Sequence, residues 1–146
     1  MDIRFSIALH VMVMISESKE LMTSEKIAKS VQTNSSYIRK VMSSLKKSEL
    51  IKSRQGVIGI ELAKRKEEIT LFDIYRSVQE TEWVTLFDIH KNSNTACPVG
   101  KYIEKTLSPT FYEIETEIVT KLKEDTLADL ICRMKEKVIE ESEKTR

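Results

Sequence analysis

The stretch SEKIAKSVQTNSSYIRKVMSSLKKSELIKSRQGVIGIELAK, residues 24–64, decides the fold of this chain. From Ser35 onward it reads as an amphipathic helix, because its apolar residues recur at i, i+3, i+4 and i+7: Ile38, Val41, Met42 and Leu45. Asn34 or Thr33 can cap this helix. A shorter helix with Thr23 as its candidate N-cap precedes it, and only the turn VQTN lies between them. Two helices joined in this way predict a helix-turn-helix.

The second half of this stretch predicts a β-hairpin. Gln55 and Gly56 break the run, and Ile58, Ile60 and Leu62 then alternate with Gly59 and Glu61, which is the period of a strand. A helix, a short helix, a basic helix and a hairpin, in that order, are typical of a winged helix-turn-helix. We therefore expect a mainly α fold with a small two-stranded wing.

The segments on either side of this stretch predict further helices. Residues 3–16 keep helical spacing, with one face that we expect to be buried, His10 included: Ile3, Ile7, His10 and Met14. The segment EEITLFDIYRSVQ predicts another helix, whose inward residues would be Leu71, Ile74, Tyr75 and Val78. Residues 80–96 are mixed in character and predict a loop.

The last third predicts three helices. We expect a short helix that begins at Pro98 and ends near Leu107, because the following SPT would break the helix. A helix beginning near Phe111 and another beginning near Leu127 follow, each with a narrow apolar stripe. Such stripes either form a dimer or pack back on their own domain. We expect a DNA-binding domain over 1–80, a sensor region made of a loop and a short helix over 81–109, and dimerisation and C-terminal helices over 110–146.

Composition and charge narrow the classes of function that this chain can have. The chain has 146 residues and a net charge of +1, but residues 34–66 hold nine Lys/Arg against two Asp/Glu, a local net charge of +7. One basic block in a nearly neutral protein indicates local anion binding. No apolar run approaches the roughly 18 residues that span a bilayer, and the start of the chain is not typical of a signal peptide. Two cysteines make no disulfide framework and favour a reducing cytoplasm.

The basic block has the shape of a DNA-reading element. In a helix-turn-helix the second helix enters the major groove with its first turns at the base edges. Arg39 is suited to a two-pronged contact with guanine, whereas Lys46, Lys47 and Arg54 are suited to phosphate. Tyr37 belongs either to the reading face or to the core. The predicted DNA-binding residues are Ser35, Ser36, Tyr37, Arg39, Lys40, Ser43, Lys46, Lys47, Arg54 and Gln55.

Nearly the whole chain resembles the Rrf2 family of bacterial winged-helix regulators. The resemblance rests on RFSIALHVM, on residues 24–64, on EEITLFDIYRSVQ and on LFDIHKNSNTACPVGKYIEKTL, and the CPVG stretch is most similar to the YwnA branch. It implies a homodimer held by a long helix over about 110–125. It also implies binding to dyad-symmetric DNA operators, usually as a repressor, and no enzyme activity. The wing departs from the family, since Gln55, Val57 and Ile58 stand where Gly or Pro is common.

The cysteine count separates this chain from the members of the family that bind an iron–sulfur cluster. The cluster-binding members have three cysteines in the region that corresponds to 81–109, whereas this chain has only Cys97 in that region. Cys97, Cys132, His10 and His90 show no zinc-ligand spacing either. We therefore expect neither a metal nor another cofactor in one chain; the alternative is a cluster shared between two subunits.

Cys97 is the candidate redox sensor. It directly precedes Pro98, a residue suited to the first position of a helix, so the thiol would sit at the N-cap, where a thiolate is favoured. We expect oxidation of Cys97, with Cys132 as a resolving thiol, to release DNA. The alternatives are a small buried residue, or gating by a small ligand in a cleft near Trp83, Phe87 and His90. A thiol enzyme using Cys97 and His90 would lack an oxyanion-hole motif and an orienting third group.

Overall fold

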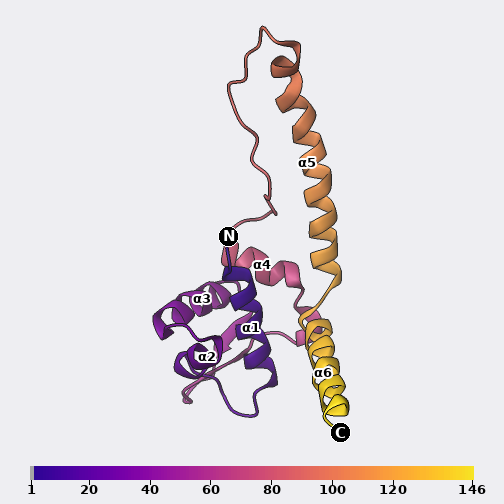
Figure 1. Cartoon of the computed structure of the whole chain (residues 1–146). Helices are drawn as coiled ribbons and strands as arrows, with labels where there is room; N and C mark the ends of the chain where they lie inside the picture. The colour runs from indigo at the N-terminus through magenta and orange to yellow at the C-terminus, as the bar shows by residue number, and fades with distance from the viewer. Residues whose placement is uncertain (1) are drawn as a thin grey trace.

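A computed structural model describes residues 2–146 of the chain (Figure 1). Its elements are α1 (Arg4–Glu17), α2 (Ser24–Val31), α3 (Ser35–Lys47), β1 (Ile51–Ser53), β2 (Ile60–Leu62), the 3₁₀ helix η1 (Lys66–Glu68), α4 (Leu71–Gln79), α5 (Pro98–Glu124) and α6 (Leu127–Lys144). The expected mainly α fold with a two-stranded antiparallel wing is confirmed. Helices α1–α4 and the hairpin form one body, from which α5 projects (Figure 1).

The helix-turn-helix forms where the sequence predicts it. Thr23 caps α2, where its side-chain oxygen accepts from the Lys26 N–H at 3.4 Å, and Asn34 caps α3 by accepting from the Tyr37 N–H at 2.8 Å. Between them Gln32 takes the left-handed conformation, with φ of 62°, and so ends α2. The four predicted apolar residues of α3 are all buried. Local caps and local periodicity are therefore enough to determine this part of the fold.

The buried face of α1 differs from the predicted one. Its buried residues are Ala8, Val11, Met12 and Ile15. Ile3 is exposed, and so is His10, whose Nε2 lies 2.9 Å from the Ser30 hydroxyl. The prediction that His10 belongs to the core is wrong. Residues 3–16 are apolar on most sides, so the helical period allows more than one stripe and contacts with α4, α2 and α3 select the one that is buried.

The wing is shorter than the alternation of residues suggests. Ile51 pairs with Leu62, Lys52 with Glu61 and Ser53 with Ile60. Ile60 is buried and also donates its N–H to the Met22 carbonyl at 3.1 Å, which ties the hairpin to the segment between α1 and α2. Ile58 lies outside β2, in the loop at the tip. The prediction that Ile58 continues the strand is therefore wrong.

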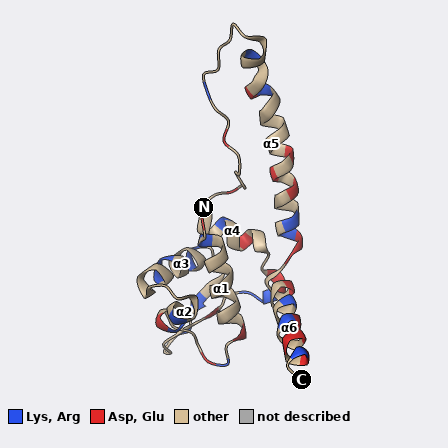
Figure 2. Ribbon diagram, viewed as in Figure 1, with Lys and Arg blue, Asp and Glu red and all other residues tan. Residues whose placement is uncertain are grey.

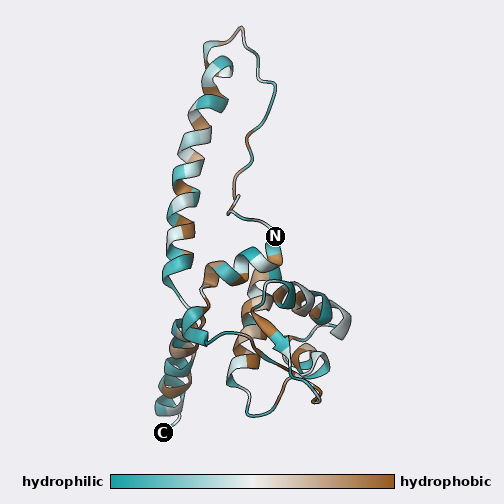
Figure 3. Cartoon of the chain, turned by 180° about the vertical axis from the view of Figure 1, so that it is seen from behind, coloured by the Kyte–Doolittle hydropathy of each residue, from teal (hydrophilic) through white to brown (hydrophobic). Residues whose placement is uncertain are grey.

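Helix α5 runs unbroken through Pro109, so the predicted break at SPT is wrong. Pro109 has no N–H to donate to the Lys105 carbonyl, which weakens the helix there. The segment 81–97 runs beside α5 (Figures 1 and 3). Lys91 Nζ donates to Glu104 at 2.8 Å on one side of Pro109, and the Leu86 N–H donates to Glu115 at 2.8 Å on the other. These long-range contacts hold the two halves in one helix.

Aromatic side chains fix segment 81–97 to α5. Trp83 stacks on Tyr112 with ring centroids 5.6 Å apart, and Phe87 packs against Phe111 at 5.0 Å. Glu115 is buried and also lies 3.4 Å from the Phe87 N–H, so its carboxylate holds two backbone donors that no helix or strand satisfies. Glu115 is a structural residue that the sequence pattern does not reveal.

Helix α6 connects α5 back to the N-terminal body. The Leu71 N–H donates to the Asp125 carbonyl at 2.9 Å, and the Leu127 N–H donates to the Ile69 carbonyl at 2.8 Å. Leu127 and Ile131 are buried in the main core, so the first half of α6 packs back on its own domain. Further along, Val138 and Ile139 are exposed. Among the described residues, no helix is both long enough and apolar enough to cross a lipid bilayer.

Candidate nucleic-acid interface

The outer face of α3 carries hydroxyl groups and positive charge. It presents five exposed side chains to solvent: Ser36, Arg39, Lys40, Ser43 and Lys47. Figure 2 shows Lys and Arg along α3, on the side of the body away from α6. The opposite face of the helix is buried in the core. The helix is therefore fixed in rotation, with its cationic side turned outward.

Ser35 and Tyr37 are less accessible than the rest of the predicted set. Both are half-buried, and the Tyr37 ring packs against the main core. Tyr37 also lines a hollow of about 320 Å³ together with Arg4 and Lys40, at the side of α3 that faces α4. Of the two alternatives for Tyr37, the packing favours a core residue at the edge of the reading face.

Arg39 is held by two neighbours. Its Nη2 donates to the Ser36 hydroxyl at 3.1 Å, and its Nη1 lies 3.6 Å from Oε1 of Glu25 on α2. The pKa of Glu25 is lowered, first by its own backbone N–H at the start of α2 and then by the Ser24 hydroxyl, so the carboxylate is charged near neutral pH. Glu25 was missed in the sequence, although it stands two residues after a predicted N-cap, where carboxylates are favoured.

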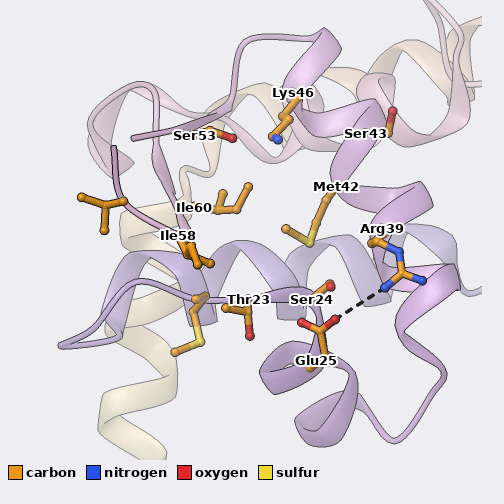
Figure 4. Close-up of a pocket in the computed structure, with 13 residues that line it drawn as sticks. Thr23, Ser24, Glu25, Arg39, Met42, Ser43, Lys46, Ser53, Ile58 and Ile60 are labelled. Carbon is orange, nitrogen blue, oxygen red and sulfur yellow. Dashed lines mark ion pairs between the residues drawn. The ribbon is translucent and has the colours of Figure 1, made fainter. Parts of the chain in front are cut away.

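A cleft of about 540 Å³ separates α3 from the wing; we call it the wing cleft (Figure 4). Its floor is apolar, with Met42 and Ile60 facing each other. Its rim is polar and brings α2, α3 and the hairpin together: Ser24, Glu25, Arg39, Ser43, Lys46 and Ser53. Lys46 thus points toward the wing rather than along the outer face of α3. Of this rim the sequence analysis predicts Arg39, Ser43 and Lys46. It does not predict that these residues surround one cleft.

The hairpin adds a second cationic element beside the cleft. Arg54 and Gln55 are exposed at the start of the tip, next to the exposed Lys52. The Lys52 amine lies 3.9 Å from Glu61 across the strands, which leaves the Arg54 guanidinium as the more available charge. A basic helix and a basic hairpin on either side of a groove match the geometry of a winged helix on a DNA duplex.

Comparison with known proteins supports the same conclusion. The profile of the Rrf2 family, described as an iron-dependent transcriptional regulator, matches residues 1–133. The chain belongs to the Rrf2 family. Like its relatives, it is a DNA-binding transcriptional regulator and not an enzyme.

Individual relatives of this Rrf2 protein cover nearly its full length. It is 39% identical over 128 residues to YwnA of Bacillus subtilis (strain 168), named as an HTH-type transcriptional regulator, which covers 88% of this chain and 94% of the relative. A crystal structure described as a DNA-binding protein is 36% identical, with a TM-score of 0.72, and covers 88% of this chain and 98% of its own. CymR, the global cysteine regulator of B. subtilis, shares the fold at 19% identity, with a TM-score of 0.66 over 91% of this chain and 96% of its own.

The iron-dependent description of the Rrf2 family raises the question of a metal. Cys97 precedes α5 and Cys132 lies in α6, so 27 helical residues, about 40 Å of helix, separate the two thiols. Within residues 2–146, no three His, Cys, Asp or Glu side chains come together as a metal site. The residues of one chain therefore do not fit an iron–sulfur cluster.

Cys97 occupies the N-cap of α5, with Pro98 at the first helical turn, as predicted. Its thiol is exposed. The backbone N–H groups of Gly100, first, and of Val99 lower the pKa of Cys97, because both donate to the thiolate. The loop is compact here: the Cys97 N–H donates to the Asn94 carbonyl at 3.3 Å, and a Cβ on Gly100 would collide with that same carbonyl oxygen. The geometry thus places a solvent-accessible thiol with a lowered pKa at a helix start.

Cys132 is exposed as well, but it is out of reach of Cys97 in the same chain. A disulfide needs Cα atoms within about 7 Å, whereas α5 alone spans about 40 Å.

The predicted aromatic cleft near Trp83, Phe87 and His90 also takes a different form. Trp83 and Phe87 pack onto α5, and the nearby hollow of about 540 Å³ is lined instead by polar residues that include Asn92, Lys101 and Lys105.

Proposed function

We propose that this Rrf2 protein acts in the cytoplasm as a homodimeric repressor that binds a dyad-symmetric operator. The observation that carries the proposal is the pairing of a rigid cationic surface, on α3 and the wing, with a long helix that leaves its body. Each chain would read one half-site, and α5 would set the spacing between the two. Occupation of a promoter by the dimer would block transcription.

The positions of α3 and the hairpin favour one orientation of the DNA duplex on this surface. The outer face of α3 would enter the major groove, where Ser36, Arg39 and Ser43 reach base edges and Lys40 and Lys47 reach phosphates. The hairpin would then meet the adjacent minor groove. The sugar–phosphate strand between the two grooves would cross the wing cleft, near Lys46 and the hydroxyls of Ser24 and Ser53.

A partly exposed apolar stripe on α5 supports a second copy of the chain as its partner, although Phe111, Ile118 and Leu122 also pack on their own chain. Apolar side chains recur along this helix at spacings of three and four (Figure 3): Ile103, Leu107, Phe111, Ile114, Ile118 and Leu122. None of them is fully buried, and Ile114 is 41% exposed. A projecting helix gains most of its stability from the packing of its apolar stripe. Two α5 helices side by side would cover both stripes at once.

Cys97 supports a redox-responsive form of this regulator. A peroxide would react with the Cys97 thiolate, so that the O–O bond breaks, the thiolate sulfur becomes a sulfenic acid and hydroxide leaves. Because Cys132 of the same chain is out of reach, the sulfenic acid would condense with a thiol of the second chain or with a small thiol, releasing water. A changed α5 N-terminus would alter the spacing of the two α3 helices and release the DNA.

A ligand-gated regulator is the second candidate function. The hollow of about 540 Å³ beside the α5 N-terminus brings the Lys101 and Lys105 side chains next to Asn92 and Ser93. With Glu104 also in the lining, the hollow suits a small polar ligand rather than an aromatic one. In this case DNA release would depend on the ligand and would persist in a Cys97→Ser protein.

In vitro selection tests the proposed function. The full-length protein would be incubated with a random 30-base-pair duplex library, and the bound duplexes sequenced with and without hydrogen peroxide. We expect a two-fold symmetric motif, two chains per duplex by sedimentation, and loss of binding in peroxide for the wild type but not for Cys97→Ser. Failure to enrich any motif would overturn the proposal. Peroxide release that is equal in both proteins would remove the redox part alone.

A further inference from the structure

The tip of the wing exposes two neighbouring apolar side chains. Ile58 is 89% exposed and Val57 is 51% exposed, in a loop whose other residues are polar or glycine. Ile58 is the most exposed of the large apolar side chains among the described residues. It touches the edge of the wing cleft but is not covered by it. Two adjacent exposed apolar side chains at a loop tip offer a contact surface for a partner outside the chain.

The base of the tip is held against the segment between α1 and α2. Gly59 has φ of 139°, and a Cβ there would collide with the Leu21 side chain, so backbone and side chain are in close contact next to Ile58. The Ile60 N–H bonds to the Met22 carbonyl at 3.1 Å, and the Val57 N–H lies 3.4 Å from the Arg54 carbonyl. Ile58 is therefore presented at a fixed position on the rim of the cleft that Arg39 and Lys46 also line.

The charges around the tip select its partner. Lys52 and Arg54 both precede the tip on the β1 side, and the nearest acid of the hairpin, Glu61, lies 3.9 Å from the Lys52 amine. An apolar tip with two cations on one side suits a ligand that has a phosphate edge and an apolar interior. A DNA duplex entered from its minor groove has both, since proteins insert isoleucine and similar side chains between base steps while cations hold the adjacent phosphates.

We propose that Ile58 is a wedge that enters the minor groove beside each half-site, partly unstacks one base step and bends the operator. This inference rests on the proposed function, because it requires that α3 occupy the neighbouring major groove. It adds a specificity determinant that makes no hydrogen bond. The chosen step would be a flexible pyrimidine–purine step, because such steps unstack at the lowest cost.

End-labelled duplexes carrying the motif enriched by the wild type test the wedge. Energy transfer between the duplex ends reports bending, and 2-aminopurine placed at each step of the flank reports unstacking. We expect the wild type to bend the duplex and to brighten one step per half-site. Ile58→Ser should lose both signals and bind about tenfold more weakly, with an unchanged salt dependence. Ile58→Leu should restore them.

Arg54→Ala is the matched control, since it removes a neighbouring charge and leaves the apolar tip. It should lower the salt dependence and keep the bend. The wedge is overturned if Ile58→Ser, folded by circular dichroism, bends and unstacks the duplex as the wild type does, or if Ile58→Ser changes the number of chains in the free protein, which would make the tip a contact between copies. If the wild type enriches no duplex, the proposed function fails and the wedge fails with it.

Discussion

Nη1 of Arg39 lies 3.6 Å from Oε1 of Glu25, so a carboxylate sits against the side chain best suited to read a guanine. The Ser36 hydroxyl accepts from the other terminal nitrogen of Arg39. Both Arg39 and Glu25 are largely exposed, so the ion pair adds little stability. Its consequence lies in DNA binding, because the pair holds the guanidinium in place and also brings a negative charge near the phosphates.

Glu25→Gln should therefore bind random-sequence DNA about threefold more tightly than the wild type, because one repulsive charge near the backbone is removed. Discrimination between the selected motif and random DNA should fall, since Arg39 loses its anchor. Anisotropy titrations with both duplexes measure the two effects. Glu20→Gln is the control, because Glu20 pairs with Lys26 at 3.0 Å and lies outside the wing cleft. Equal behaviour of the two variants would contradict the role of Glu25.

Gly59→Ala should destabilise the protein by about 2 kcal/mol. The new Cβ would meet the Leu21 side chain, and the backbone conformation at φ of 139° is strained for any other residue. Gly56→Ala is the matched variant, since Gly56 has φ of 75° but no atom within 4 Å of an added Cβ. Urea unfolding should show the larger loss for Gly59→Ala. A larger loss for Gly56→Ala would contradict the tight contact at the wing base.

Glu17 should give the protein an acid-dependent stability. Lys135 of α6 first, and then Ser16 and Lys66, lower the pKa of Glu17 from 4.5 to about 2. A carboxyl whose pKa is lower in the folded state contributes stability above the unfolded pKa and loses it as the pH falls toward the folded pKa. Glu17→Gln should thus cost about 1 kcal/mol at pH 6 and almost nothing near pH 2. Chemical unfolding across this range would contradict the prediction if the difference stayed constant.

The lowered pKa of Cys97 should appear in its alkylation rate. In a Cys132→Ser protein the only thiol is Cys97, and the N–H groups of Gly100 and Val99 favour its thiolate in the folded chain. The iodoacetamide rate should therefore rise at lower pH in the folded protein than in the same protein in urea. Coincident pH profiles in the two states would contradict the N-cap geometry.

Ile114→Glu should dissociate the proposed dimer. Ile114 is 41% exposed in one chain and belongs to the apolar stripe of α5, so a charge there would be buried without a partner in a dimer. Sedimentation velocity should show at least about a hundredfold weaker association. Thr120→Glu, about 120° around the helix, should leave it intact. A monomeric wild type would exclude α5 as a dimer interface.

Features that depend on neighbouring residues could be predicted from the sequence. The caps at Thr23 and Asn34, the apolar stripe of α3 and the position of Cys97 before Pro98 all depend on contacts within one or two turns. They determine the helix-turn-helix, most of the reading face and the helix start at the thiol.

Features that depend on contacts between distant residues could not be predicted from the sequence. The helix through Pro109 is held by Lys91–Glu104 and Leu86–Glu115, across more than ten residues each. The buried face of α1 is selected by the elements that pack on it, and β2 begins only at Ile60, which bonds to the distant Met22. The Glu25–Arg39 pair joins two helices, so neither local sequence shows it.

The salt dependence of binding to the selected duplex tests most directly whether two basic helices engage DNA. The dissociation constant would be measured by anisotropy between roughly 50 and 300 mM KCl. Over this range phosphate contacts make the affinity strongly dependent on salt. The wild type should weaken steeply, and replacement of Lys40, Lys46 and Lys47 by Ala should lower the slope by about five, for six lysines in a dimer at about 0.9 each. A flat dependence for the wild type, or a slope that the triple substitution leaves unchanged, would contradict the account.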